Sequence, residues 1–228
     1  MTLTISVIIP AIDEAAVIQA AVHSAQQSGA NEVLVVDGGS RDDTVDLAQQ
    51  AKARVVTSEP GRARQQNAGA TQATGDVLLF LHADCGLPEN GLQQVQQQLQ
   101  EVPGSPGGYF HQHIDDPATI YRWIETGNLL RARVLGWAYG DQAIFVRSEV
   151  FRALNGFPDL PLMEDLYLMK RLKREGPLID VNAPLTVSAR RWKKRGTIRQ
   201  TLRNWAMLTA VHLGVSPRAL VRYYPRTT

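Results

Sequence analysis

Residues 77–84 form the part of the chain that most restricts its fold. Apolar residues fill positions 77–81 and are followed at once by His82 and, two positions later, by Asp84. A short unbroken apolar run is typical of a strand that is buried on both faces of a parallel sheet. Open α/β sheets bind ligands at the carboxyl ends of their strands. His82 and Asp84 are therefore candidates for holding a divalent cation beside a phosphorylated ligand.

The rest of the first half alternates between strand and helix patterns. We expect strands at residues 4–10, 32–37, 55–56 and 77–81, and helices at 14–27, 42–51 and 62–74. This alternation indicates βαβ units. It predicts an α/β fold in which helices flank a mostly parallel central sheet.

The second half of the chain is less regular. Proline and glycine predict a loop at residues 103–108. Beyond this loop we expect helices at 120–134, 149–154, 164–174 and 198–213, with strands at 143–146 and 178–181. The helix at 164–174 is amphipathic, with Leu168 and Leu172 on one face and mainly basic residues on another.

Length and composition favour a soluble intracellular protein. The 228 residues, of which 44% are hydrophobic, suffice for one large domain or a domain with an appendage. Cys85 is the single cysteine, so an intrachain disulfide is excluded and a reducing compartment is expected. The first residues resemble no signal peptide, and no apolar run is long enough to span a membrane. We therefore expect a cytoplasmic protein.

The net charge of +2 conceals a strong asymmetry. Ten basic residues and no acidic residue follow Asp180, which leaves 14 basic against 22 acidic residues in the remainder, or −8. Such a basic segment indicates contact with an anionic partner, although a solvated basic surface is the simpler alternative. The helix at 198–213 has a largely apolar face. We expect it to pack on the parent domain or in a homodimer, with attachment to the inner face of an anionic membrane as the alternative.

A set of ordered motifs is shared with a known enzyme family. The motifs are Val7-Ile8-Ile9-Pro10 with Asp13-Glu14, Val35 to Ser40 with Asp43-Thr44, Asn67, Gly69, Ala73, Gly75-Asp76, Asp84, Gly156-Phe157, Glu164-Asp165 and Leu172. Together they resemble the family-2 inverting glycosyltransferases over most of residues 4–176. A small soluble bacterial subgroup is the nearest resemblance, through residues 61–64, 82–84 and 161–165.

The resemblance implies a GT-A fold and a division of the chain. Residues 1–182 would form the glycosyltransferase domain, with a nucleotide-binding half at about 1–90 and an acceptor half at about 91–182. Residues 183–228 would form a basic helical extension packed on that domain. The implied reaction moves a sugar from a nucleotide-diphosphate donor to an alcohol or lipid-linked acceptor. Nucleic acid is not an expected partner.

The resemblance also implies a set of donor-binding residues. Asp37 would contact the base or ribose, with Pro10 and Glu14 at the same edge. The alternative is an aspartate that caps the next helix, for which Asp42 and Asp43 are better placed. Arg62 and Arg64 lie near a helix start and suit phosphate recognition, or they simply form a solvated helix face. Asn67 matches a family position that supports the donor. Ile12 stands where the family often has an aromatic residue that stacks on uracil.

The metal triplet departs from the family pattern. The family usually has Asp-x-Asp, whose last aspartate coordinates Mn²⁺ or Mg²⁺ at the donor diphosphate, and here the triplet is His82-Ala83-Asp84. Histidine can bind Mn²⁺ but supplies no anionic oxygen, so weaker Mg²⁺ binding is expected. His82 could instead contact the ribose, or it could contact a metal ligand without touching the metal itself. The alternative for Asp84 is an aspartate that only starts a turn.

The acidic pair Glu164-Asp165 is the catalytic candidate by the same resemblance. Inverting transfer needs a base that deprotonates the acceptor hydroxyl. We assign Asp165 as this base, with Glu164 orienting it or taking the role. The alternative is that both acids only complement the positive end of a helix dipole.

Two further segments are candidates for the acceptor and diphosphate. Asp141 and Gln142 precede a strand and could line the acceptor pocket. Ser188-x-x-Arg191-Trp192 is similar to an element of processive relatives, in which arginine and tryptophan meet the diphosphate and acceptor. Serine replaces the usual glutamine, so processive synthesis is not expected, and the tryptophan could merely anchor a surface.

Two rival functions remain at this point. A sugar-phosphate nucleotidyltransferase would carry a glycine-rich basic loop after the first strand, where this chain has Ala11-Ile12-Asp13-Glu14. A non-catalytic nucleotide-sugar-binding regulator would bind the donor without turnover. The acidic pair at 164–165 argues against the regulator.

Overall fold

The computed structural model describes residues 2–221, apart from the side chains of Arg191, Lys194, Arg195, Ile198 and Leu202. The strands are β1 (Ile5–Ala11), β2 (Glu32–Asp37), β3 (Arg54–Thr57), β4 (Val77–Phe80), β5 (Cys85–Gly86), β6 (Gly107–Asp115), β7 (Phe145–Arg147) and β8 (Ile179–Ser188). The helices are α1 (Ile18–Gln27), α2 (Thr44–Gln50), α3 (Arg62–Gln72), α4 (Gly91–Glu101), α5 (Thr119–Leu135), the 3₁₀ turn η1 (Gly140–Gln142), α6 (Ser148–Ala153), α7 (Glu164–Glu175), α8 (Arg190–Arg195), α9 (Thr197–His212) and α10 (Pro217–Leu220).

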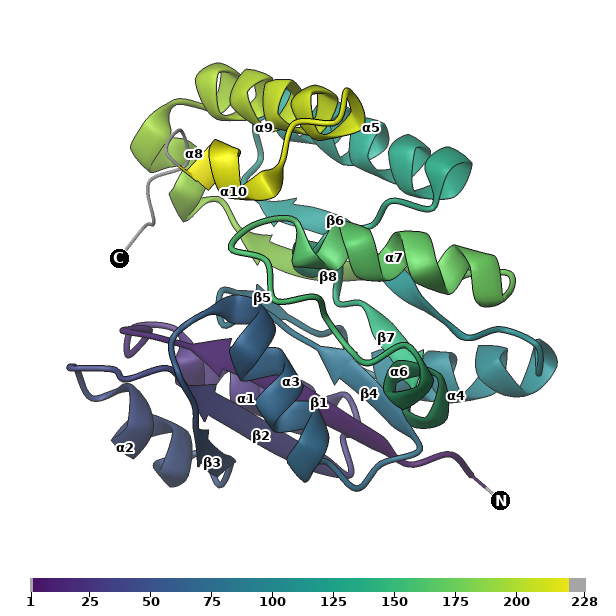
Figure 1. The fold of residues 1–228 in the computed structure, drawn as a ribbon. Coiled ribbons are helices and arrows are strands. Elements are labelled where there is room, and N and C mark those ends of the chain that lie inside the picture. Colours follow the sequence, from purple (N-terminus) through teal and green to yellow (C-terminus); the bar gives the residue numbers. More distant parts are fainter. Residues whose placement is uncertain (1, 222–228) are drawn as a thin grey trace.

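The strands form one mixed sheet with the order β3-β2-β1-β4-β7-β6-β8-β5 (Figure 1). The first four of these strands are all parallel, whereas β7 is antiparallel to both β4 and β6. The long strands β6 and β8 are again parallel. The expected α/β fold is confirmed, and the parallel strands belong to two groups joined through β7.

Helices cover both faces of the sheet because its strands alternate their apolar side chains between two cores. Val7 and Ile9 of β1 belong to the core that lies under α1, α2 and α4. Ile8 points to the other face, into the core under α3, α6 and α7. Gly69 lets α3 lie directly on the sheet, since a Cβ there would come within 2.5 Å of Ile8. The first helices and strands therefore form the expected layered arrangement.

Strand β6 was not predicted from the sequence, and the expected loop at 103–108 runs into it. Polar side chains at His111, Gln112 and His113 interrupt its apolar pattern, and the register with β8 shifts between Phe110 and His111. Gly107 and Gly108 are required by close strand pairing. A Cβ on either glycine would lie within 2.1 Å of a backbone oxygen of a neighbouring strand.

The C-terminal segment differs from the expected helical extension starting at residue 183. Strand β8 continues to Ser188 because alternate residues from Ile179 to Val187 point into the core and pair along β6. Helices begin only at Arg190. Met207, Val211 and Leu220 then pack around Leu166 of α7, which fixes α9 and α10 against the domain. Within residues 2–221, no helix combines the length and apolar character needed to cross a bilayer.

Candidate active site

A large cleft of about 850 Å³ opens at the carboxyl ends of β1 and β4. Its walls include many of the residues that the sequence singled out: Pro10, Glu14, Arg62, Arg64, His82, Asp84 and Glu164. These residues come from β1, the start of α3, the turn after β4 and the start of α7. The fold therefore brings together positions that are more than 150 residues apart in the chain.

Two buried polar side chains hold backbone segments that border this cleft. Gln65 of α3 is buried, and its amide nitrogen donates to the carbonyls of Ala11 and Val36 at 2.9 and 2.8 Å. This side chain thus links the ends of β1 and β2. The carboxylate of Asp37 is also buried and accepts from the backbone N–H groups of Gly39 and Ser40 at 3.0 and 3.1 Å. Asp37 therefore holds the turn whose glycines line the cleft, and does not itself line the cleft.

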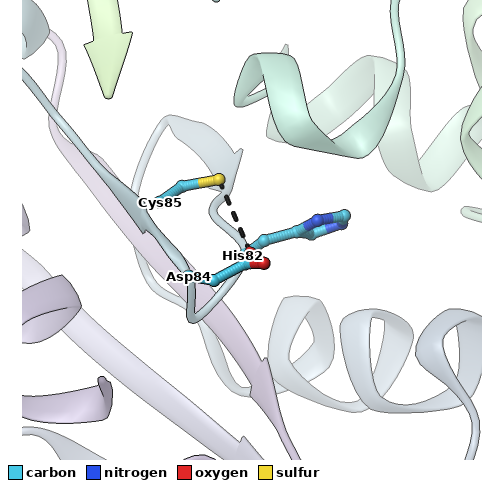
Figure 2. Close-up of side chains that lie close together, drawn as sticks. All are labelled: His82, Asp84 and Cys85. Atoms are coloured by element: carbon cyan, nitrogen blue, oxygen red, sulfur yellow. Dashed lines mark hydrogen bonds between the residues drawn. The ribbon is translucent and has the colours of Figure 1, made fainter. Parts of the chain in front are cut away.

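The turn after β4 carries the candidate metal ligands (Figure 2). Potential ligand atoms of His82, Asp84 and Cys85 all lie within 4.8 Å of one another. The sulfur of Cys85 contacts the Asp84 carboxylate at 3.8 Å, as the dashed line marks. An imidazole nitrogen and a carboxylate oxygen suit Mn²⁺, and the carboxylate also suits Mg²⁺. The residues at this turn therefore fit a divalent cation. The proximity of Cys85 was not noted from the sequence.

The imidazole of His82 is held against η1. A Cβ at Gly140 would come within 2.3 Å of His82 Nε2, so any other residue there would force this ring to move. The backbone N–H of Gly140 donates to the Asp165 carboxylate at 2.8 Å. Asp165 thus fixes the backbone segment against which His82 packs. Asp165 is buried and does not itself line the cleft.

Glu164 occupies a different environment from its neighbour. Its side chain is only 2% exposed, yet it lines the cleft, and its carboxylate lies 3.5 Å from Nη1 of Arg62. Burial raises the pKa of Glu164 to about 7, while Arg62 opposes this shift and Asp165 adds to it. Glu164 can therefore exchange a proton near neutral pH.

Four arginines stand among the described residues that line the cleft, together with five acids. Arg62 and Arg64 stand at the start of α3, where helix N–H groups also favour anions. Arg64 makes two hydrogen bonds, at 3.2 and 3.1 Å, with the exposed carboxylate of Asp159. Such an exposed pair contributes little stability, so an anionic ligand can compete for the guanidinium. The sequence analysis did not single out Arg41 or Arg218, which also line the cleft.

The C-terminal segment reaches the cleft in two places. Arg218 of α10 is one of the lining residues. Arg190 Nη2 lies 3.1 Å from the carboxylate of Glu14. The excess of basic residues after Asp180 was the sequence signal that the C-terminal segment contributes to a site. That signal did not distinguish Arg190 and Arg218 from the other basic residues.

Several predicted site residues lie away from this cleft. Asn67 exchanges two 2.9 Å hydrogen bonds with the backbone of Phe157, which ties α3 to the loop before α7. Gln142 is buried and accepts from Arg131 at 3.1 Å. Asp141 and Trp192 line a separate cavity of about 40 Å³ between α5 and α9. The side chain of Arg191 lies outside the described residues.

The comparison with known families decides the chain's affiliation. The sequence profile described as glycosyl transferase family 2 matches residues 6–155. The chain belongs to this family. The matched region contains β1 to β7 and ends before the acidic pair at the start of α7.

Curated relatives of this family 2 chain are themselves named glycosyltransferases. A PGL/p-HBAD biosynthesis glycosyltransferase of Mycobacterium bovis (strain BCG / Pasteur 1173P2) is 32% identical over 165 residues, which cover 67% of this chain and 62% of the relative. The chain thus spans about 62% of the length of that relative. A glucosyl-3-phosphoglycerate synthase of Mycobacterium tuberculosis is 32% identical over 93 residues, which cover 36% of this chain and 29% of the synthase.

Solved structures confirm the GT-A architecture. The M. tuberculosis glucosyl-3-phosphoglycerate synthase in complex with Mn²⁺, UDP and glucosyl-3-phosphoglycerate matches with a TM-score of 0.58 and 22% identity, over 81% of this chain and 71% of that one. TarS 1-349 of S. aureus in complex with UDP-GlcNAc matches with a TM-score of 0.65 and 17% identity, over 82% and 58%. At these identities the likeness shows the shared fold.

Proposed function

We propose that this protein is a metal-dependent inverting glycosyltransferase that moves a sugar from a nucleotide-diphosphate donor to an alcohol acceptor. One observation carries the proposal. A single cleft contains Asp84 and His82 at the end of β4, Arg62 at the start of α3, and Glu164 at the start of α7. These groups provide metal ligands, a diphosphate-binding cation and a proton acceptor, which sugar transfer from a nucleotide donor requires together.

The donor is assigned to the β1–β2 side of the cleft. Pro10, Glu14 and the turn held by Asp37 would contact the nucleoside, and Arg62 and Arg64 would contact the diphosphate. Asn67 would act indirectly, by holding the loop at Phe157. Arg191 and Trp192 stay proposed contacts of the diphosphate and the acceptor on the resemblance alone. The structures of relatives that contain UDP or UDP-GlcNAc support a nucleotide donor.

A divalent cation would be held by Asp84 and His82. When bound, it would neutralise charge on the departing diphosphate. The Mn²⁺ in the related synthase structure supports this assignment, with Mg²⁺ as the other candidate. The two protein ligands leave positions for oxygen ligands from the donor. The packing of His82 Nε2 against Gly140 restricts the position of the ring.

The base is proposed to come from the acidic pair. A carboxylate accepts the proton of the acceptor hydroxyl, whose oxygen forms the new bond to the anomeric carbon as the bond to the diphosphate breaks on the opposite face. Glu164 meets this need best, because it lines the cleft and its pKa lies near neutrality. Asp165, the base by resemblance, would then position Gly140 and His82.

The acceptor is assigned to the side of η1. Asp141 and Trp192 line the small cavity, where Trp192 Nε1 and the Tyr139 hydroxyl lack hydrogen-bond partners among the described residues. Buried polar atoms are usually paired, so these two groups would pair with a remote hydroxyl of the acceptor, whose reacting hydroxyl must reach Glu164 in the larger cleft. Gln142 would support the small cavity through its hydrogen bond with Arg131.

The single cysteine agrees with a cytoplasmic location.

A nucleotide-sugar panel tests the function. Thermal unfolding would be measured with each nucleotide sugar, with and without Mn²⁺, and the stabilising donor would then be incubated with simple alcohols. We expect Mn²⁺-dependent stabilisation and a glycoside whose anomeric configuration is opposite to that of the donor. Retention of configuration would refute inversion. Stabilisation without transfer or donor hydrolysis would instead indicate a regulator, and release of diphosphate from a nucleoside triphosphate would indicate a nucleotidyltransferase.

A further inference from the structure

The exposed apolar side chains are concentrated on one part of the molecule. Among the described residues, every large exposed hydrophobic side chain except Val102 lies on α5, on α9 or in the turn after α9. These side chains are Ile120, Trp123, Leu130, Val134, Leu135, Trp205, Leu213 and Val215. Soluble proteins rarely gather exposed apolar residues in this way unless the surface binds something.

On α5 these residues form a stripe along the outer face. Ile120, Trp123, Leu130 and Val134 follow one another at intervals of three, seven and four, which places them on one side of a helix. Trp123 is 75% exposed and Leu130 is 62% exposed. The opposite side of α5 carries the buried residues Tyr121 and Ala132. Helix α5 therefore has two apolar sides. One side is buried against the protein and the other is exposed.

Helix α9 lies beside α5 and extends this surface. The Tyr121 hydroxyl is 3.2 Å from Oγ1 of Thr197 at the start of α9. Trp205 is 49% exposed and lines the small cavity between the helices together with Ile124. Figure 1 shows α5 and α9 next to each other at the top of the view. The outer face of α5 and α9 therefore forms one surface, which we call the α5–α9 face.

The charged residues of the α5–α9 face indicate what kind of partner it binds. None of the exposed residues on α5, or on the described part of α9, is acidic. Arg199 is exposed and lies on the same side of α9 as Leu213, fourteen positions later. The one acid of α5, Glu125, is mostly buried and pairs with Arg122 at 3.0 Å. An apolar face with basic residues and no exposed acid complements an anionic partner.

We propose that the α5–α9 face binds the surface of a bilayer that contains anionic phospholipids. Trp123 and Leu130 would enter the boundary of the acyl chains, while Arg199 would contact headgroups. A second copy of the chain is a poorer occupant, because it would bring two basic faces together. Because α10 continues from α9 and Arg218 lines the cleft, the bound face would place the cleft near the headgroups.

Vesicle sedimentation of the full chain tests this proposal. The probes are phosphatidylcholine vesicles with and without phosphatidylglycerol. We expect binding to the anionic vesicles that weakens with salt, and little binding to the neutral ones. Leu130→Glu and Trp123→Glu should each reduce binding by about tenfold or more, and Arg199→Glu should do so on anionic vesicles alone. Val102→Glu is the matched control, since Val102 is the exposed apolar residue outside the face.

The other outcomes overturn the proposal. Absence of binding to anionic vesicles would refute it, as would equal loss of binding in Val102→Glu. A dimer mass by light scattering that Leu130→Glu halves, without vesicle binding, would identify a second copy as the occupant. Thermal unfolding of each variant checks folding, and the substituted side chains are all exposed, so little change is expected. None of these measurements depends on glycosyl transfer.

Discussion

The guanidinium of Arg62 lies 3.5 Å from the buried carboxylate of Glu164, across the cleft and 102 positions away in the chain. The acid is 2% exposed, whereas the arginine side chain is 44% exposed. Burial raises the Glu164 pKa and Arg62 opposes that rise. The contact with Arg62 therefore influences the protonation of Glu164. Of the acids Glu164 and Asp165, only Glu164 lines the cleft.

Glu164→Gln should lower the rate of sugar transfer by about 10² to 10⁴-fold, because the amide cannot accept the acceptor's proton. Donor affinity, measured by calorimetry with Mn²⁺, should change little. Asp165→Asn is the matched variant. If Asp165 were the base, Asp165→Asn would abolish transfer while Glu164→Gln retained most of it.

The pH dependence of transfer should follow Glu164. Its carboxyl is protonated below its pKa of about 7, so kcat/KM for the acceptor should fall about tenfold per pH unit below that value. Arg62→Met removes the charge that opposes the rise, and should move the profile to higher pH. An identical profile in Arg62→Met would contradict the assignment.

Stability should also depend on pH through this group. In the unfolded chain Glu164 ionises near its ordinary pKa of 4.5, but in the folded protein it ionises only near 7. Between these values only the unfolded state gains from ionisation, so the folded state loses stability as pH rises. Glu164→Gln removes this loss. Its free energy of unfolding relative to wild type should increase from about pH 4.5 to 7 and then level off, as urea titrations at each pH would show.

Asp84→Ala should remove the Mn²⁺ dependence of donor binding, because the turn loses its one carboxylate ligand. Asp159→Ala removes another carboxylate of the same cleft, which pairs with Arg64, and should leave the metal dependence intact. Calorimetric titration of the donor with and without Mn²⁺ measures both. Equal effects of the two variants would mean that Asp84 is not a ligand.

Gly140→Ala should disturb the proposed metal site by displacing His82. The new Cβ would come within 2.3 Å of His82 Nε2 and force the ring to move. We expect a loss of about 1–3 kcal/mol in the free energy of unfolding, together with weaker Mn²⁺-dependent donor binding. Gly104→Ala is the control, since a Cβ there meets nothing within 4 Å. Unchanged stability and metal dependence in Gly140→Ala would show that this contact is not required.

The sequence by itself determined the layered first half and the strand end that carries Asp84. Continuous apolar runs such as residues 77–81 identify buried strands, and such strands bring their carboxyl ends to one edge. The same local reasoning failed at β6, where the polar residues 111–113 hide a strand that long-range pairing with β8 creates.

Only the tertiary structure decided the environments of neighbouring residues. Glu164 and Asp165 are adjacent in one helical turn, and successive helix positions point about 100° apart. Packing against Arg62 and Gly140 therefore determines which carboxylate meets the cleft. The contact between Arg190 and Glu14, and the uncovered stripe on α5, likewise depend on which distant elements lie next to each other. The local sequence pattern shows where a helix or strand ends and which of its faces is apolar. Contacts between distant segments decide what each face packs against.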